Sequence, residues 1–219
     1  MPDDLRAEAL LHESCGYIET IHGVEGRAGL IFAYDALAPG TNGEHYQALE
    51  VVVSTGSQHP VLTTIHEIGH VLDGSFLNSV QTGASPTVPP GFYASDMAER
   101  VKGTELEGST LLCGWFSAIR ASAHPQALQR ALAEDEMTDA MAKEIRKLLR
   151  VRELWARSYE LFVARRHPGS VLAAEMGVEC NDSTQIGSIV VTNYWMDDDF
   201  SPIEVEIERL LRRLGWLMK

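Results

Sequence analysis

Cysteine is scarce in this chain, and the scarcity argues against two classes of protein. The three cysteines, Cys15, Cys113 and Cys180, are an odd number at wide spacing and contain no Cys-x-x-Cys pair. This pattern predicts neither a disulfide framework nor a zinc site built from thiolates. We therefore expect all three to be buried free thiols.

Basic residues and long apolar runs are also few. Lysine and arginine total 18 against 31 aspartates and glutamates, which gives a formal net charge of -13. Such a charge repels phosphate backbones and anionic membranes, so we expect neither nucleic acid nor a membrane as partner. No segment approaches the roughly 18 consecutive apolar residues of a membrane helix. The acidic N-terminus lacks the apolar run of a secretory signal, so we expect a cytoplasmic location, with secretion by an unconventional route left open.

The chain has the size and composition of one substantial globular domain. It contains 219 residues, of which 45% are apolar and 22% charged. We predict the α+β class, with a small N-terminal β-sheet and a mainly helical C-terminal half. The expected domain covers residues 1–219 and divides into a small sheet region at 1–56, a helix with two histidines at 57–74, a loop and helical insertion at 75–150, and a glutamate-bearing helix with a C-terminal helix at 151–219.

The N-terminal quarter shows β-prone patterns separated by turn residues. A short helix at 3–13 is expected before three strands, at residues 16–21, 29–34 and 48–54. Asn42-Gly43 is typical of a turn. A helix should then begin at Pro60, whose ring suits a first turn, and run to Leu72, with Gly74 ending it.

The rest of the sequence predicts one long loop and several helices. Proline and glycine indicate a loop over residues 77–96. Helical periodicity follows at residues 106–123, 125–134 and 138–166, the last divisible near Val151. Residues 186–191 are β-prone, and a final helix should begin after Ser201-Pro202 with Ser201 as its N-cap.

The segment His66-Glu67-Ile68-Gly69-His70 carries the chemistry. Residues four apart share one face of a helix, so His66 and His70 can bind one metal ion, and the pattern suits zinc. Glu67 can then act as general base toward a water whose pKa the metal lowers to about 7. Gly69 lets another element pack close to the ligands. The alternative interpretation is an ordinary polar helix face.

A third ligand is needed for a catalytic zinc, and two glutamates compete for the role. Glu153 lies on a helix that is apolar on two sides, where a buried carboxylate would need a partner such as a metal. Glu160, seven residues later, shares its face and could be the ligand or an acceptor for an imidazole hydrogen. Either could instead form a surface pair with Arg157.

These residues resemble a known family. His-Glu-Ile-Gly-His-Val-Leu-Asp at 66–73, with a downstream Glu-x-x-Ala pattern at Glu153 and Ala156, is similar to the gluzincin metallopeptidases, specifically the minigluzincins and the group like the anthrax lethal factor catalytic domain. The resemblance covers residues 60–74 and 150–163. It implies a zincin-like fold in which 57–74 is the active-site helix, with His66, His70 and Glu153 as zinc ligands and Glu67 as general base. Phe76 stands where the three-histidine metzincin pattern needs a histidine.

The expected function is a zinc metallopeptidase acting on a peptide or protein substrate. A non-catalytic zinc-binding module and a zinc amide hydrolase with a non-protein substrate stay open as alternatives. Tyr93, Tyr159 and Tyr194 are candidates for stabilising the oxyanion. The resemblance also implies an exposed strand edge for the substrate, for which residues 48–54 are the candidate. Asp73, on the face of His66, could fix a ligand or the entering chain. The long passage from His70 to Glu153 is where substrate selection is expected to lie.

Overall fold

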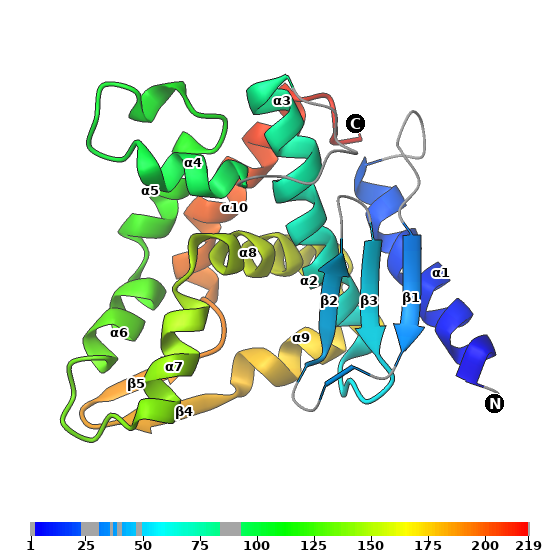
Figure 1. Ribbon diagram of the computed structural model, residues 1–219, viewed down its shortest axis with the longest axis horizontal. Coiled ribbons are helices and arrows are strands. Elements are labelled where there is room, and N and C mark those ends of the chain that lie inside the picture. The colour runs from blue at the N-terminus through cyan, green and yellow to red at the C-terminus, as the bar shows by residue number, and fades with distance from the viewer. Residues whose placement is uncertain are drawn as a thin grey trace.

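The computed structural model describes residues 3–22, 31–35, 37–38, 41–46, 50–83 and 93–218. Within them the chain is α+β, mainly helical, with one three-stranded sheet and one hairpin (Figure 1). The predicted α+β class is thereby confirmed. In the described part, no helix has the length and apolar character needed to cross a membrane.

Helix α1, Asp3–His22, is longer than the sequence pattern predicted. The expected strand at 16–21 is wrong, since these residues form the second half of this helix. Tyr17, Ile18 and Ile21 pack on the core, at helical spacing from Leu10. The apolar and polar alternation that indicated a strand is a short stretch of this longer helical stripe.

The sheet comprises β1 (Ile31–Asp35), β2 (Gly43–Tyr46) and β3 (Glu50–Ser54), in the order β1-β3-β2. Strand β1 pairs with β3 in parallel and β2 pairs with it antiparallel. Two of the three predicted strands correspond to β1 and β3, although residues 29–30 and 48–49 lie outside the described residues. The turn expected at Asn42-Gly43 is wrong, because Gly43 already pairs with Val53 in β2.

The same pairing corrects the prediction of an exposed substrate edge at residues 48–54. Strand β3 is central, with a neighbour on each side, and Val51 to Val53 are buried. Among the described strands, β2 lies at the sheet edge that contacts α2.

Helix α2, Pro60–Val71, packs on β3 and carries both motif histidines. It does not end at Gly74 as predicted. The helix continues as a π-helical segment, Leu72–Leu77, and as α3, Asn78–Thr82. Gly74 is buried inside it, and Gly83, at φ 74°, provides the left-handed residue that ends it. Leu77 is fully buried, so the apolar stripe that stabilises this helix extends past Gly74.

The loop predicted at 77–96 is only partly tested. Residues 78–82 are helical, residues 84–92 lie outside the described residues, and α4, Ala94–Arg100, follows. A short 3-10 helix, η2 (Glu107–Ser109), comes next. Four α-helices then lie within the predicted helical ranges or close to them: α5 (Cys113–Ala121), α6 (Ala123–Ala131), α7 (Asp139–Leu148) and α8 (Val151–Arg166). The predicted division near Val151 is confirmed, because Arg150 has an extended backbone between α7 and α8.

The last quarter contains a helix, a hairpin and a second helix: α9 (Val171–Asn181), β4 (Ser183–Ile186), β5 (Ile189–Thr192) and α10 (Asp197–Arg213). Helix α10 begins earlier than predicted, so Ser201 is not its N-cap and Pro202 lies inside it. Three aspartates, residues 197 to 199, occupy its first turn, where the helix dipole favours negative charge.

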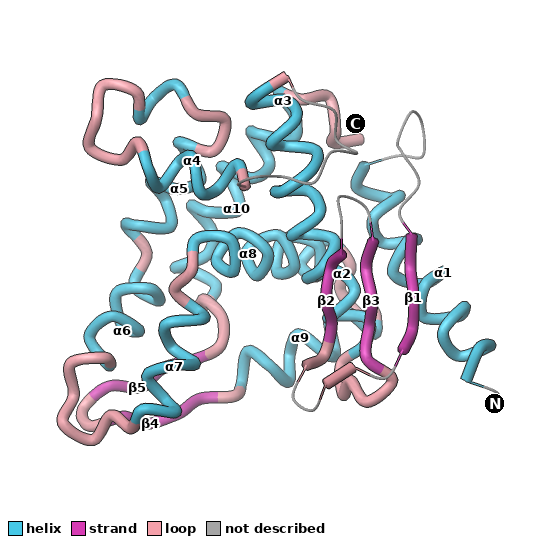
Figure 2. Tube along the Cα trace, in the orientation of Figure 1, coloured by secondary structure: helices cyan, strands magenta, loops and turns pink. Residues whose placement is uncertain are grey.

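Helix α8 is the centre of the hydrophobic core. Trp155, Tyr159 and Phe162 are fully buried, and its Ala156 and Val163 on another face are buried as well. This burial explains why its sequence is apolar on two sides. A second, smaller cluster joins α6, α7 and the β4–β5 hairpin, which lies far from the three-stranded sheet (Figure 2). The three cysteines are free, as expected, but partly rather than fully buried.

Candidate metal centre

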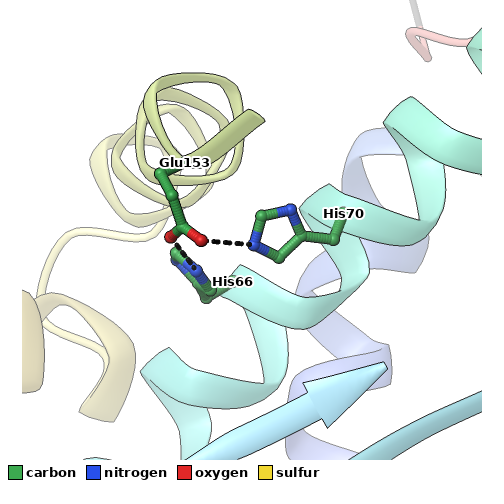
Figure 3. A group of neighbouring side chains, drawn as sticks. All are labelled: His66, His70 and Glu153. Atoms are coloured by element: carbon green, nitrogen blue, oxygen red, sulfur yellow. Dashed lines mark ion pairs between the residues drawn. The ribbon is translucent and has the colours of Figure 1, made fainter. Parts of the chain in front are cut away.

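Three side chains from two packed helices converge on one point. His66 and His70 come from α2, and Glu153 comes from the first turn of α8 and points toward both (Figure 3). Glu153 Oε2 lies 3.5 Å from His66 Nε2, and its Oε1 lies 3.8 Å from His70 Nε2. One ligand atom from each residue lies within 4.8 Å of the other two. The structure therefore brings together the three residues that the sequence predicted as ligands.

A glycine sets the spacing of the two helices. A Cβ added at Gly69 would lie 3.0 Å from the Cα of Ala156, which is closer than ordinary contact. The indole N–H of Trp155 donates to the carbonyl oxygen of Gly69 at 2.9 Å. The close approach expected at Gly69 is therefore made by α8, three residues after Glu153.

Glu160 lies behind His66 rather than in the group of three. His66 Nδ1 donates to Glu160 Oε2 at 3.2 Å, and the hydroxyl of Tyr194 donates to the same oxygen at 2.6 Å. When the imidazole is neutral, a proton on Nδ1 leaves Nε2, the nitrogen that faces Glu153, with a lone pair for a metal. This is the geometry of an acceptor that orients a ligand histidine.

Charge at the site favours a cation. Burial alone would lower the pKa of His66. Its hydrogen bonds to Glu153 and Glu160, together with the charges of Glu160 and Glu67, outweigh burial and raise this pKa to about 10. Burial likewise would raise the pKa of Glu153, yet the hydrogen bond and charge of His66, with that of His70, lower it to about 2. A positive charge between these side chains is thus strongly stabilised.

The surrounding pocket has a volume of about 320 Å³ and an excess of acidic groups. Four carboxylates line it against two fixed cations: Glu67, Glu153, Glu160 and Glu179 against Lys147 and Arg157. With neutral histidines the excess is two negative charges, the amount that one divalent cation would neutralise. The donor set and this charge both fit a divalent metal.

The alternative in which Arg157 forms a surface pair with Glu153 or Glu160 is wrong. Its side chain is only 3% exposed, and its guanidinium lies 4.8 Å from the ring centre of Tyr194 and 5.4 Å from that of Trp195. Burial lowers its pKa from the usual value, which the charges nearby partly oppose. The two-sided apolar character of α8 was the one sequence signal for this burial.

Gly43 is a site residue that the sequence analysis missed. A Cβ added there would lie 2.7 Å from Cγ2 of Thr63, 3.0 Å from Cγ of Glu67 and 3.1 Å from Oε1 of Glu67. The backbone of β2 therefore passes directly beside the carboxylate of Glu67. Nothing in the local sequence distinguishes this glycine from a turn residue, because the contact depends on how the sheet packs on α2.

The three candidate tyrosines have different surroundings. Tyr194 lines the pocket, and burial raises its pKa well above the ordinary value, which keeps its hydroxyl a donor. Tyr159 is fully buried and donates to His22 Nε2 at 2.7 Å. Tyr93 precedes α4, with the Arg152 guanidinium 4.5 Å from its ring centre. Of the three, Tyr194 is the one among the pocket residues.

Asp73 is fully buried and holds the start of α4. Its Oδ1 accepts from the backbone N–H of Ser95 at 2.8 Å and its Oδ2 from the Ser95 hydroxyl at 2.5 Å. Burial raises its pKa to about 7, although both hydrogen bonds oppose the rise. Asp73 thus fixes the start of α4, a role that the sequence did not predict.

Comparisons of the chain with protein-family models, with curated proteins and with solved structures give no match.

Proposed function

We propose that this protein is a zinc-dependent metallopeptidase of the gluzincin type, with a zincin-like fold. The observation that carries the proposal is the convergence of His66, His70 and Glu153 on one point. Glu67 lies on α2 with the two histidines and lines the pocket at this point. Two imidazoles and one carboxylate are a donor set typical of catalytic zinc.

A catalytic site also needs a coordination position open to water. Among the described residues, the group of potential donors around this point contains three side chains and no fourth. Structural zinc sites normally have four protein ligands, so three donors beside a pocket favour an enzyme over a non-catalytic zinc module.

The pocket residues divide the work of peptide hydrolysis. Bound zinc would supply Lewis acidity at the substrate carbonyl and lower the pKa of water to about 7. Glu67 accepts the proton of the attacking water and passes it to the leaving nitrogen. Glu160 holds His66 in one tautomer. Tyr194, a neutral donor, turns from Glu160 to the oxygen on which negative charge develops.

The substrate would lie along β2. Thr41, Asn42 and Gly43 line the pocket, at the start of the edge strand that passes beside Glu67. An extended peptide can add to such an edge through backbone hydrogen bonds, which places its carbonyl groups over the site. Because these bonds involve only the backbone, they provide affinity without selecting a sequence.

A test compares wild type with Glu67→Gln, and with Glu99→Gln on the exposed face of α4 as a matched control. Each protein is assayed for bound zinc and for cleavage of a proteome-derived peptide library. We expect about one zinc per chain in all three, with cleavage by wild type and Glu99→Gln and a loss of at least about 10²-fold in Glu67→Gln. If all three proteins bound zinc and none of them cleaved the library, the peptidase would be refuted. That result would favour the binding module or a hydrolase of non-protein amides.

A further inference from the structure

A second cavity, of about 490 Å³, lies between α7 and the β4–β5 hairpin. Its wall is mainly apolar and includes Leu128, Met141, Ile145, Leu148, Ile186 and Val191. Four of these belong to the buried residues of the smaller core cluster, and the other two pack against it. The cavity is thus a hollow in a fixed hydrophobic wall.

This cavity adjoins the pocket of the candidate metal centre. Leu148 and Asn193 line both of them. At the end of α7, Ile145 lines the cavity and Lys147 lines the pocket. At the end of β5, Thr192 lines the cavity and Tyr194 lines the pocket. The two hollows therefore meet between the end of α7 and residues 192–194, beside a tyrosine that contacts Glu160.

The boundary between the hollows is held in place by hydrogen bonds. The side-chain amide of Asn193 donates to Glu179 Oε2 at 3.0 Å, and the Thr192 hydroxyl donates to the carbonyl oxygen of Tyr194 at 2.7 Å. With its polar groups engaged in this way, the boundary leaves an apolar hollow next to a polar pocket.

The chemistry of the wall selects the occupant. The ionisable groups that line the cavity, Lys143, Glu144 and Asp182, are exposed to solvent, whereas Leu128, Ile145 and Ile186 are buried. Against these buried apolar side chains a polar or charged group would lose its hydration without gaining a partner, while an apolar group gains from leaving water. The volume is large enough for an aromatic or long aliphatic side chain.

We propose that this cavity is the specificity subsite of the enzyme, and that it binds a bulky apolar side chain next to the bond to be cleaved. The inference rests on the proposed function, because a peptide backbone at the metal centre is what brings that side chain to the boundary at Leu148 and Asn193. Helix α7 belongs to the insertion at 75–150, in the passage where substrate selection was expected from the sequence. The selective contacts are thus made by elements outside the segments that carry the gluzincin resemblance.

Adjacent residues of β4 provide matched variants. Thr184 lines the cavity and pairs with Val191, whereas Gln185 pairs with the exposed Val190 on the other face of the hairpin. Both are exposed strand positions, so tryptophan at either should be tolerated. Thr184→Trp places a large ring over the cavity, and Gln185→Trp places the same ring away from it. Thr184→Phe serves if the larger ring prevents folding.

Binding is measured independently of turnover, in zinc-loaded Glu67→Gln protein. The probes are blocked peptides, acetyl-Ala-Ala-Xaa-Ala-amide, in which Xaa is alanine, aspartate, leucine or phenylalanine. We expect leucine and phenylalanine peptides to bind at least about tenfold more tightly than the alanine peptide. Thr184→Trp should abolish this preference and leave the affinity for the alanine peptide within about twofold, while Gln185→Trp should preserve it. Cleavage sites of wild type should show the same enrichment beside the cut bond.

The outcomes separate the subsite from the hydrolase. Equal binding of all four peptides, or a preference that survives both Thr184→Trp and Thr184→Phe, overturns the subsite even if cleavage depends on Glu67. A preference lost in Thr184→Trp without any cleavage supports the subsite and refutes the peptidase. Binding of palmitate in the cavity, with no binding of the apolar peptides, would assign the cavity to a lipid and overturn the proposal.

Discussion

Replacing Gly69 with alanine tests how closely the helix of the histidines must approach the helix of Glu153. In an ordinary helix interior this change stabilises by about 1 kcal/mol, because alanine is the better helix former. Here the new methyl group would lie 3.0 Å from Cα and 3.3 Å from the carbonyl oxygen of Ala156. Overpacking of this kind costs about 1–3 kcal/mol, so after the helix-propensity gain we expect a net loss of up to about 2 kcal/mol.

The substitution should weaken zinc binding as well. The two helices must move apart by a few tenths of an ångström, and metal sites tolerate deviations of only about 0.2 Å. We expect the affinity for zinc to fall about tenfold, at the lower end of the losses seen when support around ligands is disturbed. Urea unfolding without zinc gives the stability, and competition with a chelating dye gives the affinity.

Two further variants make this prediction sharp. Gly16 lies in helix α1 with nothing within 4 Å of an added Cβ, so Gly16→Ala should stabilise the protein without affecting zinc. Removing the Ala156 methyl group relieves only the contact at 3.4 Å, so Ala156→Gly should rescue little of the defect. If Gly69→Ala were as stable as wild type and bound zinc equally well, backbone contact would not limit how closely α2 and α8 approach each other.

Other predictions concern charge and the reacting groups. Because folded Asp73 keeps its proton up to a pKa of about 7 instead of 3.8, wild type should lose stability as the pH rises from 4 to 7, by at most about 4 kcal/mol. Urea unfolding of the zinc-free proteins should show no such pH-dependent loss in Asp73→Asn. A difference in unfolding free energy between the two proteins that stayed constant from pH 5 to 8 would contradict the prediction. Tyr194→Phe should lower kcat by about 10²-fold or more with little change in KM or zinc content. The Cβ of Gly43→Ala would press on Thr63 and on Glu67, so kcat should fall about tenfold while zinc stays bound. An unchanged kcat would show that the close approach of β2 to Glu67 is dispensable.

The parts of the fold that could be predicted from the sequence are those with a long local signal. Helix α2 has a proline at its start and a regular apolar stripe, and α8 has apolar residues over most of its length. The spacing of His66 and His70 follows from helix geometry alone, so their common face needed no tertiary information. Glu153 was harder, and it was found through the unusual composition of the helix around it.

The errors come from places where packing overrides the local pattern. Gly74 is a common helix terminator, yet burial of Leu77 in the core stabilises a helix that continues through it. Gly43 follows an asparagine as in a turn, but pairing with β3 extends it into a strand. Arg157 resembles a surface residue, and only the tertiary structure shows its contact with Tyr194. The apolar cavity likewise joins α7 to a distant hairpin, which no local pattern predicts.

The claim that Glu153 completes the zinc centre is tested most directly by the zinc affinities of Glu153→Ala and Glu160→Ala, measured in parallel with wild type. Glu160→Ala removes the acceptor behind His66 and should lower the zinc affinity by about 10- to 100-fold. Glu153→Ala removes one of the three ligands and should lower it far more. Retention of zinc by Glu153→Ala together with its loss from Glu160→Ala would contradict the proposed centre.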